Sequence, residues 1–187
     1  MHDDIQKAIE TLKSGGVILY PTDTIWGLGC DATNAEAVKK IYQIKQRDDS
    51  KSMLVLLDHF DKIGLYLKEV PELASDLVEM AEKPLTIIYP GAVNIAKNLI
   101  AEDGSVGIRV CADDFCQKLI SRFRKPIVST SANISGQPSP AIFDEISDDI
   151  RNAADFVVQW RQNDRTPAKP SSIIKLGIKG EIAVIRE

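Results

Sequence analysis

The apolar residues of this chain follow two patterns that alternate along it. Apolar positions that recur every three or four residues indicate helices with one buried face, and short unbroken apolar runs indicate buried strands. The helical spacing predicts helices at 3–13, 34–45, 60–67, 71–81, 113–124 and 142–150. The apolar runs predict strands at 17–20, 53–57, 85–89, 106–110, 126–128, 156–158, 172–176 and 182–185. Because the two kinds of element alternate, the sequence predicts an α/β fold.

Length and composition indicate a single soluble globular domain over residues 1–187, with 44% hydrophobic and 27% charged residues. No apolar run approaches the roughly 18 residues of a membrane helix. Residues 1–4 are acidic rather than a basic signal region, so we expect a cytoplasmic protein without a membrane segment. The three cysteines lack metal-ligand spacing, and the two histidines lie far from the motifs described below. This argues against a protein-bound metal centre and against chemistry that depends on an imidazole.

A polar loop with a cationic helix behind it follows the first predicted strand. The loop contains Thr22-Asp23-Thr24, and the helix after it delivers Lys45 and Arg47 in its last turn, with Lys51 four residues further on. The net charge of -4 argues against a general nucleic-acid binder, which usually has a strongly basic surface. The cations are concentrated instead at 39–51. This pattern predicts one wall of a site for a polyanion.

A second polar loop, Ser129 to Gly136, follows the strand at 126–128. Open α/β sheets bind ligands at the ends of their strands, where serine hydroxyls, asparagine amides and loop N–H groups can contact phosphate oxygens. Loops of this composition are also common as turns and helix caps. Ser131 has no histidine to activate it as a nucleophile. Neither the P-loop nor the Rossmann glycine motif is present, so phosphate binding and loop capping both stay open on the residues alone.

The motifs in their order along the chain resemble those of the YrdC/TsaC family of threonylcarbamoyl-AMP synthases, in its short single-domain form. They are PTDTIWGLG, KQR, PLTII, VGIRV, STSANISGQPSP and PSSIIKL, followed by an arginine near the end. The resemblance runs from Gly15 to Arg186. The K-x-R and S-x-N motifs together are specific, whereas either one alone would be weak.

The resemblance implies a YrdC-like fold, in which a twisted, largely parallel open sheet with flanking helices surrounds a deep basic cavity. It also implies a nucleotidyltransferase that converts L-threonine, bicarbonate and ATP into threonylcarbamoyl-AMP (L-threonylcarbamoyladenylate) and pyrophosphate. This is the first step of the threonylcarbamoyladenosine modification of tRNA, and a partner transferase complex would complete it. Mg²⁺ would be held mainly by the ATP phosphates rather than by protein ligands.

Matching the family motifs assigns roles to ten residues. The residues implied to be catalytic are Lys45, Arg47, Ser131 and Asn133. Those implied to bind ATP are Arg47, Lys51, Thr86, Ser131, Asn133 and Arg186. Those implied to bind threonine are Thr24, Arg109 and Ser172. An arginine suits the amino-acid carboxylate because its planar fork can bind both oxygens.

The chain departs from the family pattern at several places. The usual K-G-R-P and K-P-L are replaced here by K-Q-R-D and K-S-M, and the usual W-P-G by Ala81-Glu82-Lys83. Trp26 stands where the family usually has tyrosine, and we favour core packing for it over substrate contact. The polar, proline-containing segment 159–170 is interpreted as a loop or a lid that closes over the nucleotide. Two alternatives to the synthase stay open: a YrdC-fold protein that binds tRNA or double-stranded RNA, and a paralogue without synthase activity.

Overall fold

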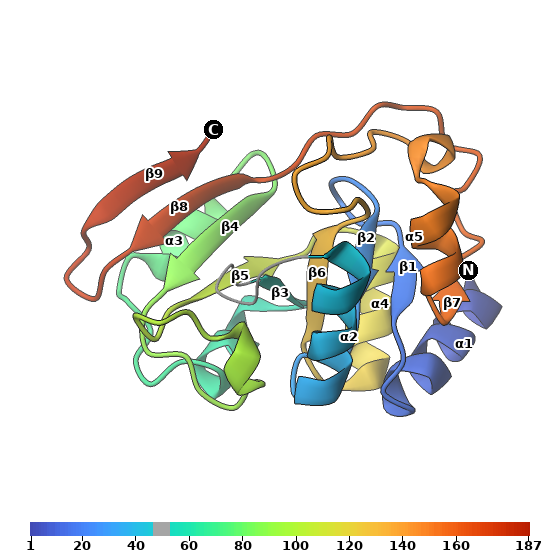
Figure 1. Cartoon of the computed structure of the whole chain (residues 1–187). Coiled ribbons are helices and arrows are strands. Elements are labelled where there is room, and N and C mark those ends of the chain that lie inside the picture. Colours follow the sequence, from blue (N-terminus) through green and yellow to red (C-terminus); the bar gives the residue numbers. More distant parts are fainter. Residues whose placement is uncertain (47–52) are drawn as a thin grey trace.

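A computed structural model describes residues 1–46 and 53–187, which form one sheet flanked by helices (Figure 1). The strands are β1 (Ile18–Tyr20), β2 (Gly27–Gly29), β3 (Leu54–Leu57), β4 (Leu85–Tyr89), β5 (Val106–Val110), β6 (Ile127–Ser131), β7 (Phe156–Val157), β8 (Ser172–Leu176) and β9 (Ile182–Arg186). The α-helices are α1 (His2–Lys13), α2 (Ala35–Lys45), α3 (Ala74–Glu79), α4 (Asp114–Phe123) and α5 (Asp148–Ala153). The 3-10 helices are η1 (Phe60–Leu65), η2 (Lys97–Leu99) and η3 (Phe143–Glu145).

The sheet has the strand order β7-β1-β2-β6-β3-β5-β4-β8-β9. Among the described residues, the pairs β1–β7, β3–β5 and β4–β8 are parallel, and the other five neighbouring pairs are antiparallel. The predicted α/β class and twisted open sheet are confirmed, but the pairing is more mixed than the expected largely parallel arrangement. Short connections account for two of the antiparallel pairs, β1–β2 and β8–β9, because residues 21–26 and 177–181 are too short for the crossover that parallel neighbours need.

Most predicted elements are present, and the departures have local causes. The pattern did not predict β2, because glycines at two of its three positions weaken the strand signal. The helix predicted at 142–150 is divided into η3 and α5, since Ser147 caps a new helix by accepting a hydrogen bond from the Ile150 amide at 3.4 Å. The segment at 60–67 forms the 3-10 helix η1 rather than an α-helix.

Capping residues fix the position of α2 and with it the position of a buried lysine. The Asn34 side chain accepts hydrogen bonds from the amides of Glu36 and Ala37, each at 3.1 Å, and so begins the helix. Gln46 ends the helix in the left-handed conformation, with φ of 48°. The last helical residue, Lys45, is thereby carried into the protein interior rather than into solvent.

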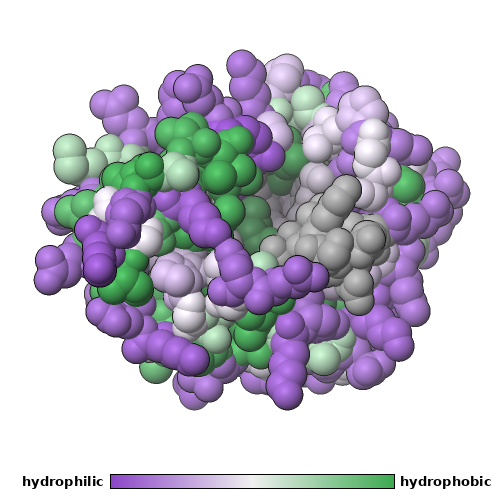
Figure 2. All heavy atoms as spheres, turned by 60° about the vertical axis from the view of Figure 1, so that its left-hand side comes forward, coloured by the Kyte–Doolittle hydropathy of each residue, from purple (hydrophilic) through white to green (hydrophobic). Residues whose placement is uncertain are grey.

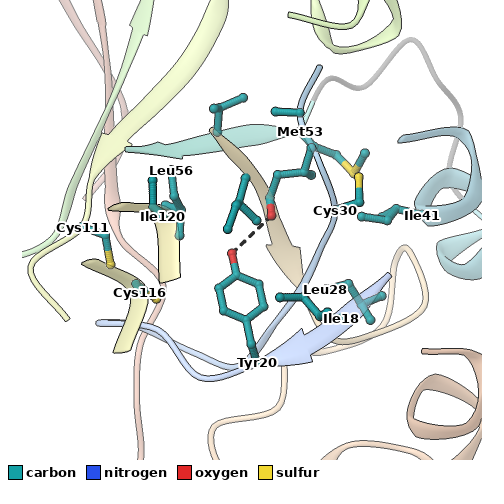
Figure 3. Packing of buried hydrophobic residues seen from close by; sticks show 14 of the residues in the cluster. Ile18, Tyr20, Leu28, Cys30, Ile41, Met53, Leu56, Cys111, Cys116 and Ile120 are labelled. Atoms are coloured by element: carbon teal, nitrogen blue, oxygen red, sulfur yellow. Dashed lines mark hydrogen bonds between the residues drawn. The ribbon is translucent and has the colours of Figure 1, made fainter. Parts of the chain in front are cut away.

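The core on the β1 side of the sheet is organised around Tyr20 (Figure 3). Its ring is fully buried among apolar side chains, and its hydroxyl donates a hydrogen bond to the Val128 carbonyl at 3.2 Å. Burial raises the pKa of Tyr20 well above its ordinary value, so the phenol stays protonated and keeps this donor. The three cysteines lie in the same core as buried free thiols.

Gly29 lies so close to Tyr20 that we expect Gly29→Ala to destabilise the protein by about 2–3 kcal/mol. A methyl group at this position would come within 2.6 Å of Tyr20 Cε1 and 2.7 Å of the Val128 carbonyl oxygen, and neither a buried ring nor a strand backbone can move freely. The measurement is the urea midpoint of unfolding. Gly107→Ala is the matched control, because its nearest new contacts are at an ordinary 3.5 Å. Equal midpoints for the two variants would contradict this packing.

Candidate active site

A cavity of about 730 Å³ lies against one face of the sheet. Alternate residues of each strand point to the same face, so Thr86 and Ile88 of β4 line the cavity beside Gly107 and Arg109 of β5. The loop after β1, the loop before β5, the end of β6 and the strands β8 and β9 form much of the remaining wall. Figure 2 shows the molecule hollowed near the middle of the face that carries β8 and β9.

The charge of the cavity is nearly balanced over the part of the chain that the structure describes. Arg109, Lys175 and Arg186 contribute cations, whereas Glu102 and Asp103 contribute carboxylates. Lys175 donates to Asp103 at 2.6 Å, and its hydrogen bond, together with those from Ser105, lowers the pKa of Asp103 to about 2. The described residues therefore do not show the strongly basic cavity that the family resemblance implies. The predicted contributors Arg47 and Lys51 lie outside the described residues.

Arg109 is the most deeply buried of the described cations that line the cavity, with only 3% of its side chain exposed. Strand β5 carries it, and its Nη2 lies 3.0 Å from Asp23 Oδ1 in the loop after β1. Among residues 1–46 and 53–187, Asp23 Oδ1 is buried without a hydrogen-bond partner, so the ion pair lacks hydrogen-bond geometry, and Arg109 Nε is likewise buried without a partner there. Buried polar groups are rarely left in this state. An anion that accepts from Arg109 would satisfy the guanidinium.

The loop after β1 presents a hydroxyl to the cavity. The hydroxyl groups of Thr22 and Thr24 are 2.9 Å apart, and the Thr24 amide donates to Thr22 Oγ1 at 3.0 Å. Thr22 Oγ1 also donates to the Ile25 carbonyl at 2.9 Å. This hydrogen-bond network fixes the backbone of the loop, and so fixes Thr24, which lines the cavity. The site thus has a positioned hydroxyl and a buried guanidinium on neighbouring elements.

A second arginine enters the cavity from β9. Arg186 donates from Nε and Nη2 to the Ser171 carbonyl at 2.9 and 2.6 Å, which fixes the guanidinium plane. Burial and the nearby positive charge of Arg109 lower the pKa of Arg186. Below it, Thr86 Oγ1 and Ser171 Oγ are 2.8 Å apart. Two like charges facing one cavity favour binding of a negatively charged ligand between them.

Lys45 joins the first polar motif to the second. Its ammonium donates to the carbonyl oxygens of Ser131 at 2.5 Å and Asn133 at 2.6 Å, with only 1% of the residue exposed. The Asn133 amide donates to the Gln137 carbonyl at 2.7 Å, and its Oδ1 is buried without a hydrogen-bond partner in the part of the chain that the structure describes. The K-x-R and S-x-N motifs therefore meet in space through a buried cation that fixes the loop after β6.

The structure brings together most of the described residues that the sequence analysis selected. The ones that line the cavity are Thr24, Thr86, Arg109, Ser131 and Arg186. Lys45 and Asn133 lie beside the cavity, where the Lys45 ammonium donates to the carbonyl oxygens of Ser131 and Asn133. At the start of β8 it is Ser171, the residue just before the strand, rather than the predicted Ser172 that lines the cavity. Two consecutive serines before an apolar run do not reveal which of them faces inward, and a shift of one residue reverses the face.

Two further predictions concern Trp26 and the segment 159–170. Trp26 is packed in the core, with its ring 4.7 Å from that of Phe143, and it also lines the cavity. Within 159–170, Pro170 is the residue that lines the cavity. The earlier part is attached elsewhere, through Arg161 to Asp113 at 2.6 Å and through Arg165 to Asp144 at 2.7 Å. Closure of this segment over a nucleotide stays a prediction.

Within residues 1–46 and 53–187, no group of three or more histidine, cysteine, aspartate or glutamate side chains is arranged to hold a metal ion. In the same part of the chain, no helix combines the length and apolar character needed to cross a membrane.

Comparison with known proteins gives one consistent relationship. The family model named for Sua5, YciO and YrdC, described as "Telomere recombination", matches residues 10–187. A threonylcarbamoyl-AMP synthase of Vibrio cholerae serotype O1 is 31% identical over 166 residues, which are 87% of this chain and 88% of the relative. The structure of E. coli YciO superposes with a TM-score of 0.86 at 25% identity and covers 100% of this chain and 90% of its own.

A third relative was solved with a ligand. The structure of P. abyssi Sua5 complexed with L-threonine has a TM-score of 0.82 and 27% identity, and the match covers 92% of this chain. It covers 50% of the Sua5 chain, so this chain spans half the length of that relative.

Proposed function

Because the chain belongs to the Sua5/YciO/YrdC family, we propose that it is a threonylcarbamoyl-AMP synthase that acts on L-threonine, bicarbonate and ATP. The relationship to the Vibrio cholerae enzyme of that name, over most of both chains, supports this activity. The family match over residues 10–187 and the single sheet support a single YrdC-like domain over 1–187.

The observation that carries the proposal is the buried guanidinium of Arg109, which lines the cavity and whose Nε lacks a hydrogen-bond partner among the described residues. A buried planar fork suits a carboxylate, since it can donate to both oxygens at once. Thr24 offers a fixed hydroxyl on the same wall to recognise the hydroxyl or amine of threonine. We assign the threonine carboxylate to Arg109. The complex of P. abyssi Sua5 with L-threonine supports an amino-acid site in this fold.

The reaction brings two anions together. The threonine amine attacks the carbon of bicarbonate, water leaves, and a carbamate forms. A carbamate oxygen then attacks the α-phosphorus of ATP, the bond to the bridging oxygen breaks, and pyrophosphate leaves with that electron pair. The protein must therefore position the reactants and neutralise their charge rather than donate a nucleophile. This suits a cavity whose hydroxyls and cations are fixed by hydrogen bonds.

The nucleotide side of the site rests on two groups of residues. Arg186 and Thr86 line the cavity next to Arg109. Ser131 lines it from the end of β6, where Lys45 binds its backbone carbonyl. We assign these residues to ATP, with Asn133 supporting the same loop and Arg47 and Lys51 adding phosphate contacts. Because Ser171 rather than Ser172 lines the cavity, we assign to Ser171 the place beside threonine that was predicted for Ser172. Lys45 would act mainly by holding the loop after β6 against the nucleotide.

Mg²⁺ is proposed to enter with ATP as the magnesium complex. Of the described carboxylates in the cavity, Asp103 already accepts from Lys175 and Ser105, so it is poorly placed to hold a cation of its own. Phosphate oxygens are the natural ligands of Mg²⁺ in such a site. The ion would neutralise phosphate charge, while the protein residues orient the carbamate.

The synthase reading is tested by pyrophosphate release from ATP in bicarbonate and Mg²⁺, with threonine, serine or no amino acid. We expect release that depends on threonine and is weaker with serine, because serine has the same polar groups but lacks the methyl group of threonine, a difference worth roughly 1–3 kcal/mol. Release that is independent of the amino acid, or none from folded protein, would contradict the proposal.

The partners are proposed on the same basis. The product is an activated acyl group, and we propose that a transferase complex acting on tRNA consumes it and that the protein works in the cytoplasm with its substrates. Weak RNA binding of its own would fall steeply with salt. The comparisons do not favour the RNA-binding protein or the inactive paralogue as the main function.

A further inference from the structure

Arg161 has a backbone conformation that few residues other than glycine adopt. It follows β7 and has φ of 67°. A left-handed conformation of this kind costs free energy and persists where surrounding contacts hold it. In this protein the Arg161 side chain makes those contacts. Its position is therefore fixed by distant parts of the chain as well as by the local sequence.

The Arg161 guanidinium joins three parts of the chain. Its Nη1 donates to Asp113 Oδ2 at 2.6 Å and to the Thr22 carbonyl at 3.3 Å, and its Nε lies 3.7 Å from Asp164. Asp113 is the N-cap of α4, because its other carboxylate oxygen accepts from the Cys116 amide at 3.0 Å. The arginine is thus attached to the start of a helix, and through it to the loop after β1.

The loop is held at two successive carbonyl groups. The Cys116 thiol donates to the Pro21 carbonyl at 3.3 Å, and Arg161 donates to the next carbonyl, that of Thr22. The hydroxyl of Thr22 is in turn within 2.9 Å of the Thr24 hydroxyl, which lines the cavity. Asp23, between them, pairs with Arg109. A movement of Thr22 would therefore displace both groups assigned to threonine.

We propose that Arg161 is a positioning residue for the amino-acid substrate, acting through Thr22 on Thr24 and on the Asp23–Arg109 pair. The inference rests on the proposed synthase function. Arg161 itself does not contact the substrate. It acts by fixing the positions of Thr24 and Arg109, which recognise threonine. A displacement of about 1 Å in such groups can cost on the order of 100-fold in rate.

The test is steady-state kinetics with threonine and ATP varied separately. Arg161→Gly removes the guanidinium, and glycine adopts the left-handed conformation without strain, so the backbone is not disturbed. We expect KM for threonine to rise roughly ten-fold and KM for ATP to stay within about two-fold of wild type, since the displaced groups face threonine. Arg161→Lys, which keeps the charge, should restore part of the loss.

Asp113→Asn tests the same connection from its other end. Asparagine keeps the helix cap but loses the charge that fixes Arg161, so we expect a smaller rise in the threonine KM, of about three-fold. The double variant with Arg161→Gly should be no worse than Arg161→Gly alone, because the two side chains act through one contact. Asp113→Asn also provides a test if Arg161→Gly does not fold.

Arg165→Ala is the matched control. Arg165 belongs to the same segment and pairs with Asp144 at 2.7 Å, but none of its described contacts reaches the loop after β1. We expect its threonine KM to be unchanged. A folded Arg161→Gly protein with a wild-type threonine KM, or with an equal rise in the ATP KM, would overturn the role of Arg161 while leaving the synthase intact. A wild-type protein that lacks threonine-dependent pyrophosphate release would overturn the proposed function, and the inference with it.

Discussion

Replacing Arg109 by glutamine is expected to lower kcat/KM for threonine by about 100-fold or more, since truncating one member of a buried charge pair costs roughly 2–5 kcal/mol. The substrate carboxylate would lose both donors of the guanidinium fork. The Asp23 carboxylate, buried against Arg109 at 3.0 Å, would also lose its cation. The measurement is pyrophosphate release with threonine varied at saturating ATP.

The unpaired Asp23 complicates this variant, because leaving one buried charge alone can destabilise a protein by about 3–5 kcal/mol. Two further variants separate binding from stability. Asp23→Asn combined with Arg109→Gln removes both charges and should recover much of the stability but little of the activity. Arg109→Lys keeps a cation beside Asp23 but loses the planar fork, so it should remain folded with at least a ten-fold loss. A folded double variant with a normal threonine KM would show that the carboxylate binds elsewhere.

Replacing Lys45 by methionine is expected to raise KM for ATP by roughly 30-fold or more and to lower the free energy of unfolding by about 2 kcal/mol, because buried carbonyl groups lose their donor. Methionine fills a similar volume, so packing is largely kept. The Ser131 and Asn133 carbonyl oxygens, at 2.5 and 2.6 Å from the ammonium, would no longer be held in place. The loop after β6 would then be free to move away from the nucleotide.

Lys40→Met is the matched control for this change. Lys40 lies on the same helix α2 and its ammonium also donates to a backbone carbonyl, that of Gly15 at 2.8 Å, but in an exposed position away from the cavity. We expect its ATP KM and urea midpoint to stay close to wild type. A Lys45→Met protein whose ATP KM matches that of Lys40→Met would refute the coupling of the two motifs through Lys45.

The sequence predicts a helix or strand well where a single local pattern of residues defines that element. Apolar runs of strand length locate β1 and β3, and the helical spacing of apolar residues locates α2 and α4. Strand β2 could not be found in the same way, because two glycines carry no side-chain pattern. The mixed pairing of the sheet depends on which strands become neighbours, and local spacing does not contain that information.

The site is predictable from motifs only as a set of residue types. The motifs select Arg109 and Thr24 but do not give their relative position. That position depends on Asp23, which lies next to Thr24 in sequence and pairs with Arg109 on another strand. The contact between Arg161 and Thr22 joins residues separated by 139 positions and belongs to no motif. Ser171 was missed because the side of a strand that a residue faces depends on register.

The measurement that tests the central claim most directly is the mass of the product formed from ATP, L-threonine and ¹³C-labelled bicarbonate. We predict an adenylate that contains threonine and one labelled carbon, formed in an amount equal to that of the pyrophosphate released. This outcome requires that the carbamate carbon comes from bicarbonate and that its oxygen attacks the α-phosphorus. ADP and phosphate as the products, or an adenylate of threonine without the label, would contradict it.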